Sequence, residues 1–506
     1  MRLSLRDFFL RFGLLSLLSA TALASGCKVG RDDVDTWKGT VKGPGKMVAV
    51  MMADKYDLDL RGYAALALVD MERHDVDGVA ELLNALQKVD AKTREQLIQK
   101  LTPGLVESMN ARAEAAAGSD TSGGPPARQI RAKDAAFAVI PHAGADSRKT
   151  LTQAVMRWYT VDFNGRSLSG NYSAEQVVRA LGSPAASMLV DALNARLPQQ
   201  ALIKLAELIG QLGDPATKQR AAQKLVAIEA EMYAAPFVDW LKGQIVSQLG
   251  EAATKDPARV EKAALLNRDK FVDEGAIPAM KHLADQPEIA SRLLAIASDK
   301  NPALTERRTR ALQALEGKVR EEHLSPLLAL ALDPAAPPTV QDYAFDRVAD
   351  IRSPNAIPPM WALVQDGAKQ RLRWRAGELV LAIGGSSVLS EFFAKLPTGP
   401  DVQYEPEELE GYALRIGQMT PLPSAIASAQ LASPDWWDRV IALHFFQRKG
   451  TQADIPAVSR LVGDSAPVKG KHWGPGMTVG KVAKQALDGL RERLGQPQAG
   501  QQAQSG

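Results

Sequence analysis

Four cations and an indole fall within seven residues at Lys369, Arg371, Arg373, Trp374 and Arg375. A guanidinium group offers a planar fork of N–H donors, so this cluster could bind a carboxylate or a phosphate group. On a helix, Arg371 and Arg375 share one face because they are four residues apart. Arginines at the start of a packed helix also commonly contact carboxylates of neighbouring turns. We favour this second, structural interpretation.

A second cluster lies in residues 469–476, a segment too rich in glycine to be helical. Lys469, Lys471 and Trp473 are its candidate binding residues, because an exposed Trp on a loop can anchor a partner. The same loop could instead fold back and cap the apolar end of the molecule. The sequence leaves both interpretations open.

The remaining groups show no recognisable catalytic or metal-binding pattern. There is no Gly-x-Ser-x-Gly or Gly-x-x-x-x-Gly-Lys-Ser/Thr motif, and no Gly-x-Gly-x-x-Gly motif after a strand. The histidines never stand in His-x-x-x-His or His-Glu-x-x-His spacing: His74, His142, His282, His323, His444 and His472. A zinc site would need histidines and carboxylates gathered from distant parts of the chain. We therefore predict no catalytic residues, no metal and no cofactor.

The only cysteine, Cys27, directly follows a short apolar segment. Residues 12–23 have the length of a signal-peptide core and fall short of the roughly 20 residues that span a bilayer. Residues 23–27, Leu-Ala-Ser-Gly-Cys, resemble the lipobox of a bacterial lipoprotein, with Leu one position further upstream than usual.

That resemblance implies cleavage before Cys27 and acylation of its sulfur, as with palmitate, and of its new amino group. Each buried acyl CH₂ contributes roughly 0.8 kcal/mol, so several chains would anchor the protein stably. Lys28 in place of Asp implies the outer membrane, with the protein facing the periplasm. The alternative is an ordinary cleaved signal with an incidental cysteine. The lack of a second cysteine favours the lipoprotein interpretation, because the thiol has no intramolecular partner.

The composition argues against nucleic-acid binding and favours helices. The whole chain has a formal charge of +3, and residues 1–26 hold three Arg and one Asp, so the remainder is close to neutral. Aromatic residues make up only 6% of the chain. A chain dominated by Ala and Leu packs more readily as helices than as a β-sandwich.

Helical segments separated by short turns recur along the chain. Within residues 202–212, the apolar side chains follow the i, i+3, i+4 spacing of a buried helical stripe. The turn that follows is Gly213-Asp214-Pro215. We expect Gly213 to be a left-handed C-cap, Asp214 the N-cap of the next helix, and Pro215 its first residue.

An Ile-Pro helix start recurs at residues 276–278, 356–358 and 454–456. Together with the Gly-Asp-Pro turn and an Arg-x-x-Ala second helix, it resembles HEAT repeats, most clearly in residues 174–228 and 340–396. The resemblance implies an all-α fold, a right-handed α-α superhelix of the HEAT or armadillo type.

We predict a chain organised into eight consecutive parts. These are a signal peptide (1–26), a tether (27–50), N-terminal repeats (51–112), a flexible linker (113–130), a central solenoid (131–396), a loop (397–410), C-terminal repeats (411–494) and a disordered tail (495–506).

Helical solenoids present a long concave face that holds other macromolecules. We therefore expect a non-enzymatic, lipid-anchored scaffold of the cell envelope that binds a protein or peptide. One alternative is an enzyme or cofactor-handling protein of the envelope. Another is a module that grips peptidoglycan through the face carrying Arg371 and Arg375.

Overall fold

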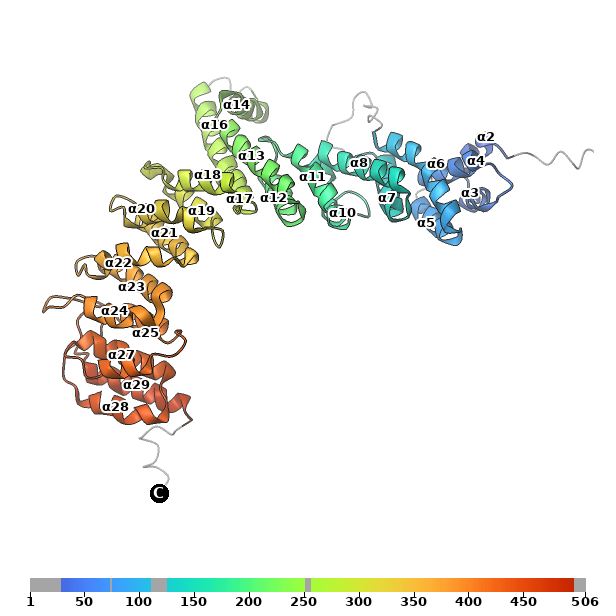
Figure 1. Cartoon of the computed structure of the whole chain (residues 1–506). Coiled ribbons are helices and arrows are strands. Elements are labelled where there is room, and N and C mark those ends of the chain that lie inside the picture. The colour runs from blue at the N-terminus through green and yellow to red at the C-terminus, as the bar shows by residue number, and fades with distance from the viewer. Residues whose placement is uncertain (1–28, 73–74, 111–124, 251–255, 496–506) are drawn as a thin grey trace, which may run out of the picture. The chain divides into compact units, whose positions relative to one another are not determined.

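The computed structural model describes residues 29–72, 75–110, 125–250 and 256–495 (Figure 1). Within these ranges the chain forms helices joined by turns and loops, and the one strand-like pairing in them is an isolated bridge between Pro467 and Thr478. The predicted all-α class is therefore confirmed. The chain divides into two compact units, Met1–Leu283 and Ala284–Gly506.

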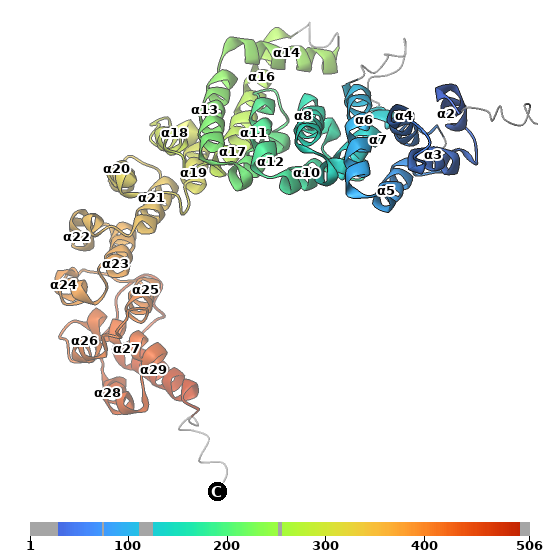
Figure 2. The same cartoon turned by 45° about the vertical axis from the view of Figure 1, so that its right-hand side comes forward.

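In the first unit, neighbouring helices pack in sequence order, α3 on α4, α4 on α6, α6 on α7 and α8, α8 on α11, and α11 on α12 and α13 (Figures 1 and 2). Its elements are α2 (Arg31–Trp37), α3 (Gly43–Met52), α4 (Leu58–Val69), α5 (Gly78–Lys88), α6 (Ala91–Asn110), α7 (Ala127–Val139), η1 (Ile140–His142), α8 (Ala145–Val161), α9 (Phe163–Arg166), α10 (Ala174–Leu181), α11 (Ser183–Ala192), α12 (Gln199–Leu212), α13 (Pro215–Met232), α14 (Ala235–Leu249), α16 (Pro257–Phe271), η2 (Val272–Ala276) and α17 (Ile277–Lys281).

The second unit is a regular stack of helix pairs. Helices α20 and α22 pair with α21 and α23, and α19, α21, α23, α25, α27 and α29 form one continuous row. Its elements are α18 (Pro287–Ala297), η3 (Pro302–Leu304), α19 (Thr305–Ala314), η4 (Glu321–His323), α20 (Leu324–Leu332), α21 (Pro338–Ile351), η5 (Pro354–Ala356), α22 (Ile357–Val364), α23 (Gln370–Gly384), η6 (Gly385–Val388), α24 (Leu389–Lys395), α25 (Pro406–Ile416), α26 (Ser424–Gln430), α27 (Trp436–Lys449), η7 (Gln452–Asp454), α28 (Ile455–Arg460), η8 (Leu461–Gly463) and α29 (Val479–Arg493). Stacked pairs of this kind define a HEAT-like helical solenoid.

The predicted turns mostly form as expected. Helices α22 and α28 each begin at the Ile of an Ile-Pro pair. The start predicted at Ile277 does not form, because α16 continues through η2 into α17. At the Gly-Asp-Pro turn, Asp214 accepts the backbone N–H of Thr217 at 2.7 Å and Pro215 begins α13. The left-handed C-cap predicted for Gly213 is wrong, because its φ is −68°. The site needs glycine for space, since a Cβ there would lie 2.6 Å from the carbonyl oxygen of Ile209.

Three predicted boundaries differ from the structure. The expected tether, 27–50, contains α2 and most of α3, which pack on α4 through buried residues such as Val34 and Met47. Its glycines allow close packing, since a Cβ on Gly43 would meet the backbone oxygen of Trp37 at 1.9 Å.

The other two differences are helices that begin inside expected loops. Helix α7 begins at Ala127, within the expected linker 113–130. Helix α25 begins at Pro406, within the expected loop 397–410, where proline suits the first helical turn. The expected signal peptide, Cys27, most of the linker and all but the first residue of the expected tail lie outside the described residues.

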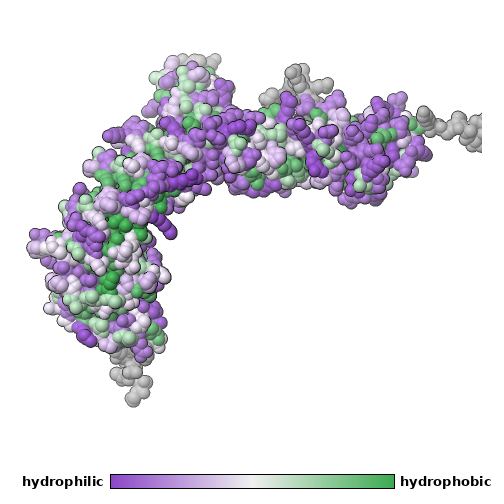
Figure 3. Space-filling model, in the orientation of Figure 1, coloured by the Kyte–Doolittle hydropathy of each residue, from purple (hydrophilic) through white to green (hydrophobic). Residues whose placement is uncertain are grey.

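Among the described residues, the segment Gln370–Lys395 is long and apolar enough by composition to cross a membrane. It consists of α23, η6 and α24, and the chain bends at Gly385, whose φ is +57°. Helix α23 packs between α21 and α25. Hydrophobic side chains reach the surface over the part that carries α22 to α25 (Figure 3). We interpret the segment as a core element of the repeat stack.

Candidate functional site

The cationic cluster lies at the start of α23, and two of its arginines face α21. Arg371 pairs with the carboxylate of Asp342, and Arg375 pairs with that of Asp346. The Nε atom of Arg375 is also 3.9 Å from Asp342. The two arginines thus share one face, and their contacts are those of the structural interpretation.

The charge pairing continues along the row of helices. Arg415 of α25 lies 3.7 Å from the carboxylate of Glu378 on α23, and Arg448 of α27 lies 3.2 Å from that of Glu410 on α25. Burial raises the pKa of Glu378, although the guanidinium groups of Arg415 and Arg375 act in the opposite direction. Because the arginines of each helix pair with carboxylates of the preceding helix in the row, the surface formed by α21, α23, α25 and α27 has no excess of positive charge at these positions.

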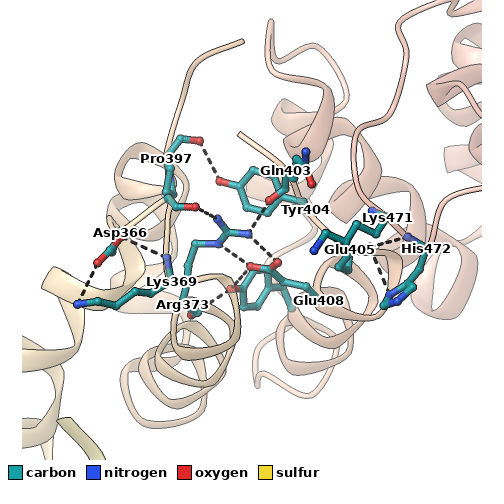
Figure 4. Close-up of polar contacts among 12 residues, drawn as sticks. Asp366, Lys369, Arg373, Pro397, Gln403, Tyr404, Glu405, Glu408, Lys471 and His472 are labelled. Carbon is teal, nitrogen blue, oxygen red and sulfur yellow. Dashed lines mark hydrogen bonds and ion pairs between the residues drawn. The ribbon is translucent and has the colours of Figure 1, made fainter. Parts of the chain in front are cut away.

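Arg373 points into the stack and is completely buried (Figure 4). Its Nε and Nη2 atoms each donate to a carboxylate oxygen of Glu408 at 2.8 Å, and Nη2 also donates to the carbonyl oxygen of Gln403 at 2.8 Å. Arg373, one of the candidate binding residues, is therefore out of reach of a partner, in line with the structural interpretation. A helical pattern alone did not show that a guanidinium on this face meets a buried carboxylate.

Aromatic side chains complete the surroundings of this ion pair. The guanidinium carbon of Arg373 lies 4.2 Å from the ring centre of Tyr404, and the Tyr412 hydroxyl donates to Glu408 at 3.0 Å. Burial by itself would lower the pKa of Arg373, but the hydrogen bonds and charge of Glu408 outweigh it and raise that pKa. The buried pair ties α23 to α25 and to the segment before it.

Trp374 is half-buried against α25. A Cβ on Gly411 of that helix would lie 2.9 Å from the indole nitrogen, so glycine is what allows this approach. The indole nitrogen itself has no hydrogen-bond partner. Trp374 therefore contributes mainly to packing between the two helices.

The loop 469–476 folds back onto the segment that precedes α25. The Trp473 indole donates to the carbonyl oxygen of Tyr404 at 2.7 Å, and the Lys469 ammonium donates to that of Pro400 at 2.7 Å. The Trp473 ring meets Trp436 edge-on at 6.4 Å between ring centres. The loop thus folds back, as one of the two interpretations expected, but it covers the segment before α25 rather than the end of the stack, and Lys471 stays exposed.

The structure brings the two predicted clusters together through Glu405, which the sequence interpretation missed. Its carboxylate accepts the backbone N–H groups of Lys471 and His472 at 3.0 and 2.9 Å (Figure 4). Burial would raise the pKa of Glu405, but these hydrogen bonds outweigh it and lower that pKa. The only sequence signal was an acidic residue directly before a proline at a helix start.

A cavity of about 480 Å³ opens where α23, the start of α25 and the loop 469–476 meet. Its lining mixes charges of both signs: Gln370, Arg371, Trp374, Glu405, Glu407, Glu408, Lys471 and His472. Two of its carboxylates, Glu405 and Glu407, and the imidazole of His472 are in reach of solvent.

The first unit carries a larger and more apolar cavity of about 850 Å³. It is formed by α7, η1, α8, α10 and α11, and none of the predicted site residues lies in it. Its lining residues are Phe137, Ile140, Pro141, Ala145, Arg148, Lys149, Thr152, Gln153, Ala180, Leu181, Pro184 and Met188.

No family model and no curated protein matches the sequence. Among solved structures, the chain is similar to the karyopherin Kap121p bound to the SUMO protease Ulp1p, with 13% identity, a TM-score of 0.33 and coverage of 95% of this chain and 48% of that one. Kap121p bound to the extreme C-terminus of the protein phosphatase Cdc14p gives 13% identity, a TM-score of 0.34 and coverage of 95% and 49%. The chain thus spans about half the length of these karyopherins.

A third similar structure comes from a study of tubulin recruitment by microtubule polymerases with TOG domain arrays, with 11% identity, a TM-score of 0.19 and coverage of 92% and 99%. These likenesses are distant, and the class of this protein follows from its own architecture. It is an all-α helical solenoid built from stacked helix pairs.

Proposed function

We propose that this protein is a non-enzymatic scaffold that binds an apolar segment of another protein in the first-unit cavity. The observation that carries the proposal is the cavity itself, about 850 Å³ between successive helices of the stack. Cavities of this size with an apolar lining are typical of binding sites for small molecules and for side chains of a partner.

The residues that line the cavity indicate which kind of peptide would bind there. Phe137, Leu181 and Met188 supply apolar surface, and the flexible thioether of Met adapts to side chains of different shape. Arg148 and Lys149 are exposed at the rim. The expected ligand is a peptide segment that carries apolar residues beside a carboxylate, since complementary charge favours association.

Met188→Glu tests this proposal, because it places a charge in the apolar lining. The matched control is Val161→Glu at the end of α8, where the native side chain is 68% exposed and does not line the cavity. Fluorescent peptides that pair Leu or Phe with Glu should bind the native protein and the control similarly, and Met188→Glu at least 10-fold more weakly. Equal binding by all three proteins would exclude the cavity as the binding site.

We also propose that Cys27 carries the lipid anchor and holds the scaffold at the outer membrane, facing the periplasm. The lipobox-like sequence before Cys27 supports this proposal. In a bacterial host, Cys27→Ala should move the protein from the membrane fraction to the soluble fraction. Retention of the variant in the membrane fraction would contradict the anchor.

The structure weakens the peptidoglycan-binding hypothesis and adds one observation in favour of the enzyme hypothesis. The peptidoglycan hypothesis relied on the arginine face, but Arg373 is buried and Arg371 and Arg375 pair with carboxylates of α21. The enzyme hypothesis gains one observation, the carboxylates and His472 around the second-unit cavity. His472 is 68% exposed at its side chain, which suits ligand binding better than chemistry that must exclude water.

A further inference from the structure

Three side chains that can bind a metal ion converge beside the second-unit cavity. The carboxylates of Glu405 and Glu407 and the imidazole of His472 place one ligand atom each within 4.8 Å of one another. Glu405 and Glu407 flank the start of α25, whereas His472 belongs to the loop before α29. The sequence did not indicate this set, because His472 lies more than sixty residues after the two glutamates.

The distance between His472 and Glu405 fits two ligands of one metal ion better than a hydrogen-bonded ion pair. The Nδ1 atom of His472 lies 3.4 Å from the nearer oxygen of Glu405 and 3.9 Å from that of Glu407. A charge-assisted hydrogen bond would be about 2.7–2.9 Å. Two ligands of one tetrahedral zinc ion, each about 2.0–2.2 Å from the metal, stand about 3.3–3.6 Å apart. The His472–Glu405 distance lies in this range, and the exposed Glu407 carboxylate must move slightly closer to His472 to complete the set.

One ligand is already fixed by surrounding hydrogen bonds. The Glu405 side chain is 13% exposed, and its carboxylate accepts the backbone N–H groups of Lys471 and His472. Such outer hydrogen bonds orient a ligating carboxylate before the metal arrives. The same two bonds hold the backbone of His472 beside Glu405, so only small side-chain movements remain.

The balance of charge favours a cation at this position. Of the charged groups around the cavity, Glu408 is neutralised by Arg373, and Arg371 pairs with Asp342. The groups left over are the carboxylates of Glu405 and Glu407 opposite the ammonium of Lys471, an excess of one negative charge. The cavity is therefore unsuited to the carboxylate or phosphate ligand expected from the arginines.

We propose that Glu405, Glu407 and His472 bind a divalent first-row transition ion, with Zn²⁺ as the best match in ligand type and geometry. Three protein ligands leave one position open to water on the cavity side. The ion joins the segment before α25 to the loop 469–476 and thereby fastens the two loops together. This inference concerns the second unit and does not depend on the peptide-binding function proposed for the first.

The test is Zn²⁺ titration by calorimetry of the chain from residue 27 onwards, stripped with chelator and carrying Cys27→Ala to remove its only thiol. One Zn²⁺ should bind per chain, raise the melting temperature and slow hydrogen exchange in 469–476. His472→Gln and Glu407→Gln should each weaken binding at least 10-fold. Both native side chains are largely exposed, so the variants should keep the fold, which circular dichroism verifies.

Two matched controls separate this site from other sources of zinc affinity. His142→Gln removes an exposed histidine of the first unit, and Glu391→Gln removes an exposed carboxylate of α24. Both should bind Zn²⁺ as the parent does. The proposal is overturned if His472→Gln retains the parent affinity, or if Mg²⁺ protects 469–476 as well as Zn²⁺ does, because a hard cation would not need the imidazole.

Discussion

Removing the guanidinium of Arg373 should strongly destabilise the second unit. In Arg373→Met, the carboxylate of Glu408, which is 0% exposed, loses both of its 2.8 Å hydrogen bonds to the guanidinium. The hydroxyl of Tyr412 remains as a donor at 3.0 Å, but it carries no charge. Leaving one partner of a buried ion pair without compensation costs about 3–5 kcal/mol. Loss of the cation–π contact with Tyr404 adds about 0.5–2 kcal/mol.

Native-state hydrogen exchange can measure the loss of stability at the helices around the Arg373–Glu408 pair. The backbone amides of α25 and of residues 403–405 should exchange at least 100-fold faster in Arg373→Met, since about 1.4 kcal/mol corresponds to a factor of ten. Arg371→Met is the matched control on the same helix. Its ion pair with Asp342 is about 40% exposed on both sides, and exposed pairs contribute about 0–1 kcal/mol.

The double variant Arg373→Met/Glu408→Met separates charge from packing. If an uncompensated buried carboxylate causes the destabilisation, removing it should restore much of the stability lost in the single variant. A double variant less stable than Arg373→Met would refute this reasoning. So would an Arg373→Met variant whose exchange rates match those of Arg371→Met.

Two further buried ionisable side chains give predictions of their own. Burial raises the pKa of Asp438 to about 7, so the native state keeps a proton that the unfolded chain releases near pH 4, and stability falls as pH rises through that window. Asp438→Asn should remove this decline, worth about 2.5 kcal/mol between pH 5 and pH 8, in denaturant unfolding compared at those two pH values; an unchanged pH dependence would contradict the assignment. In the first unit, buried Lys133 donates to the carboxylate of Asp134 and to the carbonyl oxygen of Tyr172 at 2.9 Å. Lys133→Met should cost about 3–5 kcal/mol and speed exchange around Tyr172, whereas Lys149→Met at an exposed position should change neither.

The features of the fold that could be predicted from sequence are those fixed by neighbouring residues. A helix that begins at Ile-Pro needs only the fixed φ of proline and its missing N–H group, and the predicted starts at Ile357 and Ile455 form. At Ile277 the helical backbone instead continues from α16 through η2. The tether was misinterpreted because Gly43 resembles a flexible position. Its role depends on how closely the backbone of Trp37 approaches, and composition does not show that distance.

The candidate site could not be predicted in the same way, because each of its roles depends on the element packed opposite. Arg371, Arg373 and Arg375 look equivalent in the sequence, yet two meet carboxylates of α21 at the surface and one meets Glu408 in the core. Since successive positions on a helix point about 100° apart, alternate arginines must face different neighbours. A cationic cluster on a helix of a repeat stack therefore indicates, in the first place, that the adjacent helices carry carboxylates that pair with it. It indicates a ligand only when those helices supply too few carboxylates, and here they supply enough.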